Sequence, residues 1–489
     1  MNNSPTSAQS RKMSLLVAFI PVIALIAMLA GDVIYFGEDS SYGANQMALL
    51  IASLIAGGIG VYRGTKWEEI RKAIASSIGQ ATEAILILLL IGALAGTWLM
   101  AGIIPAFIHY GLMVLQPEIF LFAATIVCAM LSLATGSSWG TVGTVGVALV
   151  GIGTALGLDT GWIAGAIISG AYFGDKLSPL SDTTNLAPAV AGTDLITHIK
   201  YMTITTIPSF VIALIVFLIV GFGGNASSGV DAGFAEGFGE AVNGMFAIHP
   251  GLFVAPIAVL VMIARKVPAA PALFIGVLLG ALTAVIFQPD VIMMVAGGDL
   301  NFASASYVAS MKAMAVETSY VTGNELADSL LSAGGMNGMM NTIWLILCAM
   351  TFGAVLQAAG MLKRITTALI SGVNSVFGLI SRTVGTCIAF NVLASDQYIA
   401  IVVPGKMFSD AFDAQGLAPE NLSRTLEDAG TVTSVLIPWN TCGVAQSGIL
   451  GVATLAYAPY CIFNWLSPIM SLVVAGLGYK LKYKNGEKR

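Results

Sequence analysis

The sequence predicts an all-α, polytopic membrane protein with inverted-topology repeats, broken helices and re-entrant hairpins. Of its 489 residues, 57% are hydrophobic and 10% are charged, whereas soluble domains are usually about 25% charged. Apolar runs of about 20 residues, long enough to cross a bilayer as helices, recur along the chain. The 55 glycines favour close packing between such helices.

The composition excludes several other classes of protein. The net charge of −5 is small and says nothing about nucleic acid, but no run of basic residues suggests a nucleic-acid surface. The three histidines and five cysteines show no spacing typical of a zinc site. No catalytic constellation or phosphate-binding loop stands out, so we expect neither an enzyme nor a bound cofactor.

The first membrane half is predicted over 14–222, after a leader at 1–13. The apolar run at 14–31 is long enough to span and lacks a cleavage site, which indicates a retained helix rather than a signal peptide. Further helices of this half are expected at about 45–62, 83–104, 118–134, 161–176 and 203–222.

A connecting region is predicted at 223–340. It contains two apolar runs, at about 251–264 and 269–287, and loops rich in acids that we expect outside. The last of these loops should be a mixture of short helices and coil. A second membrane half at 341–480 follows, and its helices are expected to include about 341–361 and 459–479.

Basic residues set the expected orientation. They occur in the leader (Arg11 and Lys12), between the second and third helices (Arg63 to Lys72) and in the tail at 481–489. By the positive-inside rule these segments are cytoplasmic. We therefore expect a multi-pass protein of the cytoplasmic membrane with both termini in the cytoplasm.

A polar segment interrupts the apolar sequence at 168–201. Pro179 and Pro188 each remove a backbone donor and disfavour helix at the preceding residue, so a helix should stop near Leu177 and resume after Asn185. Within a bilayer, unwound backbone is tolerated only where it is buried in protein or lines a wet cavity. An ordinary cytoplasmic loop is the alternative.

The core of this segment resembles the signature of the NhaC-type sodium/proton antiporters, a family within a larger ion-transporter superfamily. Residues 170–188 read Gly-Ala-Tyr-Phe-Gly-Asp-Lys-Leu-Ser-Pro-Leu-Ser-Asp-Thr-Thr-Asn-Leu-Ala-Pro, and Gly-Thr-Asp-Leu-Ile-Thr-His follows at 192–198. The resemblance extends over about 14–480. It implies exchange of Na+ for H+, and it also includes members that exchange organic acids, such as malate against lactate, with sodium and protons.

One offset relates the two membrane halves. Matching pairs lie 258 positions apart: Gly102 with Gly360, Ser137 with Ser395, and Asp182-Thr183 with Asn440-Thr441. The offset aligns a helix end, a hairpin tip within 134–144 and the polar break. Because charge bias places the two helix ends on opposite sides, we predict an inverted repeat that forms a site at the midplane. Chance similarity between small residues is the alternative.

Candidate ion-binding residues lie at these breaks. An ionisable residue inside a membrane costs several kcal/mol, so Asp175, Asp182 and Asp396 come first, with ordinary interfacial carboxylates as the alternative. Asp182 is the favoured carrier because it lies in the proline-flanked break. Neutral oxygen ligands, the kind that a hard cation prefers, are expected from Ser137, Ser138, Thr183, Asn185, Ser395, Asn440 and Thr441. For Na+ itself we expect Asp182, Thr183, Asn440 and Thr441.

Three further residues are expected in supporting roles. Lys176 points about 100° away from Asp175 on a helix, and it either pairs with Asp182 or Asp194 or faces the cytoplasm. Asp194 and His198 are spaced to touch on one helix face. We interpret that pair as a structural contact rather than a proton relay.

The leading functional hypothesis is a secondary antiporter with Na+ and H+ as its transported ions. A carboxylate that binds either a proton or Na+, but not both, couples the two ions by competition. The alternative is an organic-acid exchanger of the same fold, with Arg382 or Arg424 as anion ligands and half-helix N-termini beside them. A passive channel accounts less well for paired breaks. A homodimer is possible.

Overall fold

The computed structural model describes residues 13–36, 40, 42–224, 234–265, 267–322, 328, 330–370 and 375–484. Arg11 and Lys12 of the predicted leader and the last five residues of the predicted tail lie outside this part of the chain. Within it the fold is a helical bundle. The two strands, β1 (Thr318–Ser319) and β2 (Ser332–Ala333), have two residues each and pair antiparallel. The predicted all-α class is confirmed.

Among the described residues, nine helices are long and apolar enough to cross a membrane. They are α1 (Leu15–Phe36), α2 (Ala44–Tyr62), α4 (Thr82–Met100), α6 (Pro117–Thr135), the continuous stretch of α7 and α8 (Ser138–Ala155), α11 (Leu195–Phe222), α14 (Ala269–Phe287), the stretch of α18 and α19 (Gly335–Ala358) and α21 (Val376–Leu393). This confirms a polytopic membrane protein.

Shorter elements complete the bundle. In the first half they are α3 (Trp67–Gln80), α5 (Ile103–Val114), α9 (Thr160–Leu177) and α10 (Asp182–Ala191). In the connecting region they are α12 (Phe234–Met245), α13 (Val254–Ala264), α15 (Pro289–Ala296) and α16 (Phe302–Ala315). In the second half they are α20 (Met361–Ile370), α22 (Gln397–Ala414), α23 (Pro419–Leu426), α24 (Thr441–Leu450), α25 (Thr454–Tyr457) and α26 (Ile462–Gly476).

The helix expected at 83–104 is shorter than predicted. It ends at Met100 because Gly102 adopts a left-handed conformation, with φ 75°, which a glycine tolerates and which terminates a helix. The separate helix α5 then begins at Ile103. Sequence reasoning missed α5, since its residues continue the apolar run.

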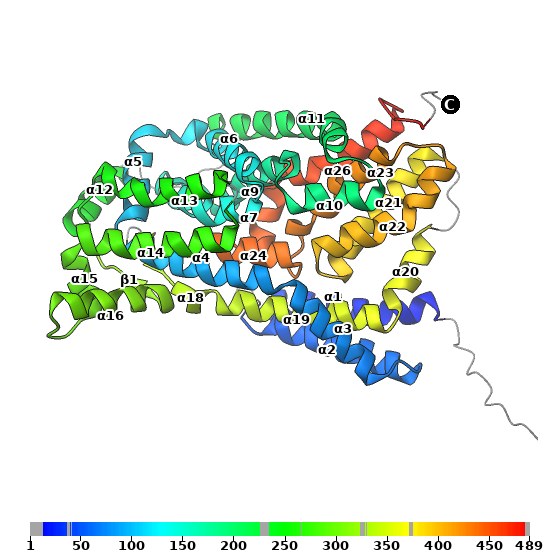
Figure 1. Ribbon diagram of the computed structural model, residues 1–489, viewed down its shortest axis with the longest axis horizontal. Coiled ribbons are helices and arrows are strands. Elements are labelled where there is room, and N and C mark those ends of the chain that lie inside the picture. The colour runs from blue at the N-terminus through cyan, green and yellow to red at the C-terminus, as the bar shows by residue number, and fades with distance from the viewer. Residues whose placement is uncertain are drawn as a thin grey trace, which may run out of the picture.

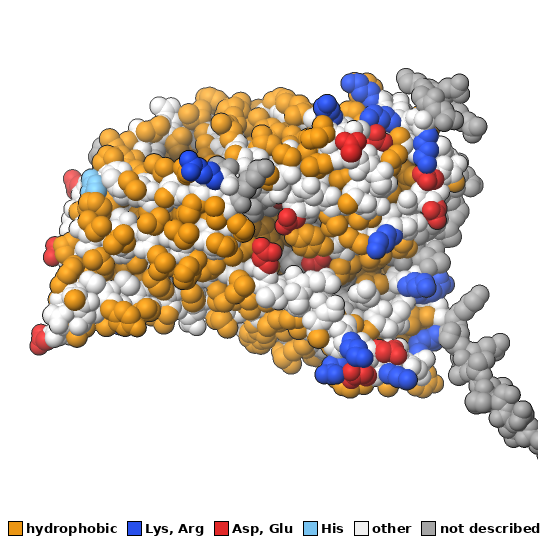
Figure 2. All heavy atoms as spheres, in the orientation of Figure 1, with side chains coloured by type: hydrophobic (Ala, Val, Ile, Leu, Met, Phe, Trp, Pro, Cys, Tyr) orange, Lys and Arg blue, Asp and Glu red, His pale blue; other side chains and the backbone are white. Residues whose placement is uncertain are grey.

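The two ends of the molecule differ in charge. The elements α12, α15 and α16 lie at one end of the long axis, and α20 and the C-terminus lie at the other (Figure 1). Figure 2 shows that most Lys and Arg side chains on this face gather at the end with the C-terminus, whereas hydrophobic side chains cover much of the middle. A basic end next to an apolar belt is the distribution that the positive-inside rule describes.

Helix boundaries recur between the two halves. Both ends of α19 (Met340–Ala358) lie 258 positions after those of α4, and both ends of α24 lie 259 positions after those of α10. The offset grows by one between the end of α21, 258 positions after that of α6, and the N-cap of α22, Asp396, 259 positions after that of α7, Ser137. By these boundaries Asn440 corresponds to Ser181 rather than to Asp182, since the two residues are the N-caps of α24 and α10.

The corresponding helices α4 and α19 end at opposite ends of the molecule. The carbonyl of Ala101 accepts a hydrogen bond from Gln288 Nε2 at 3.2 Å, next to the start of α15. Ala359 instead packs against Gly60 near the end of α2, towards the end that carries α20 (Figure 1). This arrangement supports the predicted inversion, which stays a prediction.

Candidate functional site

A cavity of about 490 Å³ lies where the helix breaks of both halves meet. Four carboxylates line it, from Glu83, Asp175, Asp182 and Asp396, and none of its described lining residues is Lys, Arg or His. Figure 2 shows acidic side chains near the middle of the molecule, away from both ends. Such a cavity attracts cations and repels anions, because low-dielectric walls strengthen the field of its charges.

Close helix packing places Asp175 in this cavity. The helix α9 lies directly against α6, where a Cβ added at Gly174 would be 2.3 Å from the carbonyl oxygen of Ala129. Thr125 of α6 also donates a hydrogen bond to the carbonyl of Ala166, at 3.1 Å. These contacts fix the last turn of α9, which carries Asp175, opposite the first hairpin tip.

Asp175 is a buried carboxylate with one oxygen free of hydrogen bonds. Its Oδ2 accepts a hydrogen bond from Ser138 Oγ at 2.8 Å, whereas Oδ1 is buried and has no hydrogen-bond partner. The residue is only 8% exposed. A buried carboxylate oxygen without a partner is costly, and binding of a proton or a cation would offset that cost.

The first break is shorter than predicted. The helix α9 ends at Leu177 as expected, but α10 resumes at Asp182 rather than after Asn185. The reason is that Ser181 caps α10, with its Oγ accepting a hydrogen bond from the Thr184 amide. Pro188 lies inside α10.

Residues of the first break differ in their access to the cavity. Asp182 is exposed at its wall, and Thr183 lines it while buried. Asn185 is not among the lining residues. Its Nδ2 instead donates hydrogen bonds to the carbonyls of Pro179 and Ser181, at 3.0 and 2.7 Å. Asn185 thus holds the shape of the break.

The first hairpin tip contributes hydroxyl groups. Ser137 and Ser138 line the cavity together with Thr135. Ser137 is the N-cap of α7 (Ser138–Thr141), and its Oγ accepts a hydrogen bond from the Gly140 amide at 3.0 Å. After α7 the chain forms a π-helical turn, Val142–Gly146, and continues as α8 (Val147–Ala155).

The second hairpin tip places Asp396 at the cavity. Asp396 is the N-cap of α22, is 5% exposed, and accepts the Ile399 amide at 3.0 Å. The preceding Ser395 has φ 58°, a left-handed conformation that is uncommon for residues other than glycine. Its carbonyl accepts the Thr441 amide at 2.9 Å, which joins this tip to the second break. Thr441 lines the cavity.

Asn440 is fully buried beside the cavity but is not among its lining residues. Its Oδ1 accepts the Cys442 amide at 3.0 Å, and its Nδ2 donates to the carbonyl and side-chain oxygens of Asn391, at 3.0 and 3.2 Å. In this conformation Asn440 holds the second break together. Its direct contact with Na+ stays a prediction.

The structure thus brings together most of the predicted ion-binding residues. The cavity is lined by Ser137, Ser138, Asp175, Asp182, Thr183, Asp396 and Thr441. Asn185, Ser395 and Asn440 support the backbone around it. Sequence reasoning did not single out Glu83, at the start of α4, or Tyr398, both of which also line it.

The contacts predicted for the supporting residues are corrected. Lys176 is fully buried and pairs with Asp428, rather than with Asp182 or Asp194 or the cytoplasm. Asp194 is exposed and caps α11 by accepting the Thr197 amide at 2.9 Å, a hydrogen bond that lowers the pKa of its carboxyl. His198 faces inward.

The expected side-chain contact between Asp194 and His198 is therefore absent, since the Asp194 carboxylate is engaged by the helix N-terminus. His198 Nδ1 lies 2.8 Å from Ser423 Oγ instead.

An α-helical membrane protein with an acidic cavity between broken helices has the architecture of a secondary transporter. A family model described as the Na+/H+ antiporter family matches residues 170–479, and the chain belongs to this family.

Three relatives illustrate its range. The chain is 37% identical to the Na(+)/H(+) antiporter NhaC of Alkalihalophilus pseudofirmus, over 88% of this chain and 90% of that protein. It is 37% identical to the malate-2H(+)/Na(+)-lactate antiporter of Bacillus subtilis, over 90% of each. It is 35% identical to the arginine/ornithine antiporter ArcD of Halobacterium salinarum, over 96% of this chain and 93% of that protein. All three are antiporters, which supports the expectation of a transporter rather than an enzyme.

Proposed function

We propose that the protein exchanges Na+ for H+ across the cytoplasmic membrane by alternating access. The observation that carries this proposal is the Asp175 carboxylate, whose Oδ1 is buried without a hydrogen-bond partner at a cavity lined by three further carboxylates. Oxygen ligands of this kind suit a hard cation. A proton and Na+ compete for the same oxygens, so that release of one permits binding of the other.

The ligand set follows from the lining residues. Asp175 and Asp396 are the buried carboxylates, and the hydroxyl groups of Ser137, Thr183 and Thr441 are candidate neutral ligands. Because Asp175 belongs to the first half and Asp396 to the second, movement of one half against the other would change the distance between them. Alternating access by inverted repeats uses this kind of motion around a site at the repeat interface.

The orientation belongs to the same proposal. We place the basic end of the molecule, with α20 and the C-terminus, in the cytoplasm, as the positive-inside rule requires. The end with α12, α15 and α16 then lies outside (Figure 1). The possible homodimer stays a prediction.

Exchange of an organic acid is less well supported. The described cavity lining has no basic residue to bind a carboxylate. Arg424, one of the two arginines expected to bind an anion, is fully buried and does not line the cavity. The malate/lactate antiporter among the relatives keeps this alternative open to test.

Transport by the purified protein in liposomes separates these functions. With a Na+ gradient and an enclosed pH dye, we expect proton movement against Na+ without any organic acid. Malate or lactate should leave the rate unchanged. Proton movement that requires malate or lactate would favour the organic-acid exchanger. Decay of the Na+ gradient without proton movement, or of a proton gradient without Na+, would indicate a channel.

A further inference from the structure

A second group of ionisable residues lies apart from the cavity. Lys176 of α9, Arg424 of α23, and Glu427 and Asp428 of the π-helical turn Glu427–Thr431 are all fully buried. None of the four lines the cavity. Burial of a charge costs several kcal/mol unless it is paired and hydrogen-bonded, so the partners of each group decide its charge.

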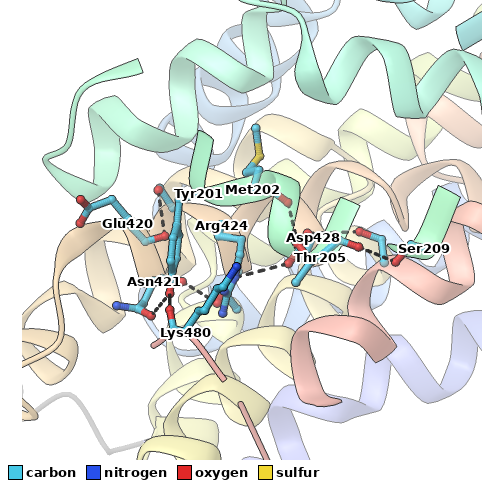
Figure 3. Close-up of polar contacts among 12 residues, drawn as sticks. Tyr201, Met202, Thr205, Ser209, Glu420, Asn421, Arg424, Asp428 and Lys480 are labelled. Atoms are coloured by element: carbon cyan, nitrogen blue, oxygen red, sulfur yellow. Dashed lines mark hydrogen bonds and ion pairs between the residues drawn. The ribbon is translucent and has the colours of Figure 1, made fainter. Parts of the chain in front are cut away.

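Both cations of this group are directed towards Asp428. Lys176 Nζ donates to Asp428 Oδ1 and, at 2.8 Å, to Ser467 Oγ. Thr205 Oγ1 donates to the same Oδ1 at 3.0 Å. Arg424 Nε lies 3.8 Å from Asp428 Oδ2, and Figure 3 shows its guanidinium between this carboxylate and the Tyr201 ring, 4.7 Å from the ring centroid. Asp428 therefore faces both cations of this group, although its Oδ2 and the guanidinium nitrogens of Arg424 have no hydrogen-bond partner.

Glu427, the next residue in the chain, has no such partners. Both of its carboxyl oxygens are buried and lack a hydrogen bond. Among the described residues, Asp428 forms the ion pairs with Lys176 and Arg424, and Glu427 forms none with either cation. An ionised carboxylate in this position would be far more costly than a protonated one. Burial without a hydrogen bond therefore favours the neutral, protonated form of Glu427.

The surroundings of Glu427 include charges on several helices. The charges of Lys176 and Asp175 on α9 and of the adjacent Asp428 act on its carboxyl. From α21 the thiol of Cys387 is a neighbour. From α11, His198 lies near Lys176. The charged residues of α22, which also packs against this turn, are exposed: Lys406, Asp410 and Asp413.

We propose that Glu427 is a second proton-binding site of the transporter, in addition to the carboxylates for which Na+ and a proton compete. This inference rests on the proposed function and deepens it. When the O–H bond of Glu427 breaks, the proton leaves and the electron pair stays on the carboxylate. Lys176 is the cation whose charge acts on that carboxylate, so it would turn from Asp428 towards Glu427. Because Lys176 follows Asp175 on α9, deprotonation would act on the helix that carries the Na+ ligand.

The variant Glu427→Gln tests this site, because Gln keeps the shape of a protonated Glu and cannot release a proton. We expect Na+-driven proton flux in liposomes to fall at least about tenfold, while counterflow of radioactive sodium against unlabelled sodium stays within about threefold of wild type. Glu427→Asp, which restores a titratable group, should recover part of the proton flux. The matched control is Glu420→Gln, seven residues earlier, where the carboxylate pairs with the half-exposed Lys482 at 3.3 Å.

The outcomes separate the two proposals. Wild-type proton flux in Glu427→Gln would overturn the role of Glu427 and leave the proposed function standing. A second outcome would also overturn it. If Glu427→Gln still elutes as a monodisperse species but loses both sodium counterflow and proton flux, and Glu427→Asp recovers neither, the residue is structural. A wild-type protein without Na+-driven proton flux would overturn the proposed function itself.

Discussion

Ser138 Oγ donates a hydrogen bond of 2.8 Å to Asp175 Oδ2 and so joins the first hairpin tip to the end of α9. The other oxygen of Asp175 has no hydrogen-bond partner. One oxygen is thus held by the protein, while the other is buried without a hydrogen-bond partner. In metal sites, outer-shell partners orient a ligand through its second oxygen, and Ser138 would do the same for Asp175 in its proposed role as an ion ligand.

Ser138→Ala should therefore weaken Na+ binding without abolishing transport. The carboxylate of Asp175 would remain but lose the donor that orients it, and hydrogen bonds to charged groups contribute about 1.5–3 kcal/mol. We expect the apparent KM for Na+ to rise about tenfold or more, with a smaller change in the maximal rate. Measurement of exchange against Na+ concentration checks this. An unchanged KM would show that the hydrogen bond does not orient the ligand.

The two carboxylates of the first half should differ in their effect on exchange. The sequence favours Asp182 as the carrier, but the structure leaves Asp182 exposed and buries Asp175. We expect Asp175→Asn to reduce exchange at least about a hundredfold and Asp182→Asn to reduce it less than about tenfold. Exchange rates of both variants, measured over a neutral to alkaline pH series, test this order of effects. The reverse order of effects would return the carrier role to Asp182.

Local sequence patterns predicted much of the fold. The runs at 45–62 and 269–287 correspond closely to α2 and α14, because continuous apolar sequence bounded by polar residues marks a span directly. The short helix α5 could not be separated from α4 by hydropathy. The sequence also predicts that the helix resumes after Asn185, whereas α10 begins at Asp182. The cap formed by Ser181 outweighs the tendency of Pro188 to disfavour helix at the residues before it.

Site residues could be predicted where the neighbouring sequence alone marks them as unusual. Asp175 and Asp396 stand out as acids in apolar sequence, and both line the cavity. The pairing of Lys176 with Asp428 was not predictable, since it joins residues 252 positions apart. Glu427 could have been suspected, because two consecutive acids in a buried segment need an explanation.

Asn440→Ala should destabilise the protein. The substitution removes the N-cap of α24 and two hydrogen bonds to Asn391, and loss of a cap alone costs about 1 kcal/mol. We expect a lower Tm in detergent, measured by intrinsic fluorescence, and partial recovery in Asn440→Ser, which restores the cap. A normal Tm combined with a raised KM for Na+ would instead support the direct ligand role.

Gly174→Ala should displace α9 from α6. Its Cβ would lie 2.3 Å from the Ala129 carbonyl oxygen, and overpacking of this kind costs about 1–3 kcal/mol. We expect both a lower Tm and slower exchange, because Asp175 follows directly in the chain. Gly385→Ala on α21, where a Cβ would meet no atom within 4 Å, is the matched control and should leave both unchanged. Equal effects of the two substitutions would contradict the close-packing argument.

Opposite orientation of α4 and α19 predicts opposite labelling of the helices that follow them. Met113, near the end of α5, is 72% exposed, and Lys363 at the start of α20 is also exposed. In a cysteine-free background, Met113→Cys should react with a membrane-impermeant maleimide added outside. Lys363→Cys should react only after the membrane is opened, because the basic end is cytoplasmic in our proposal. Reaction of both from the same side would rule out the inverted arrangement and, with it, the placement of Asp175 and Asp396 on repeats that move in opposition.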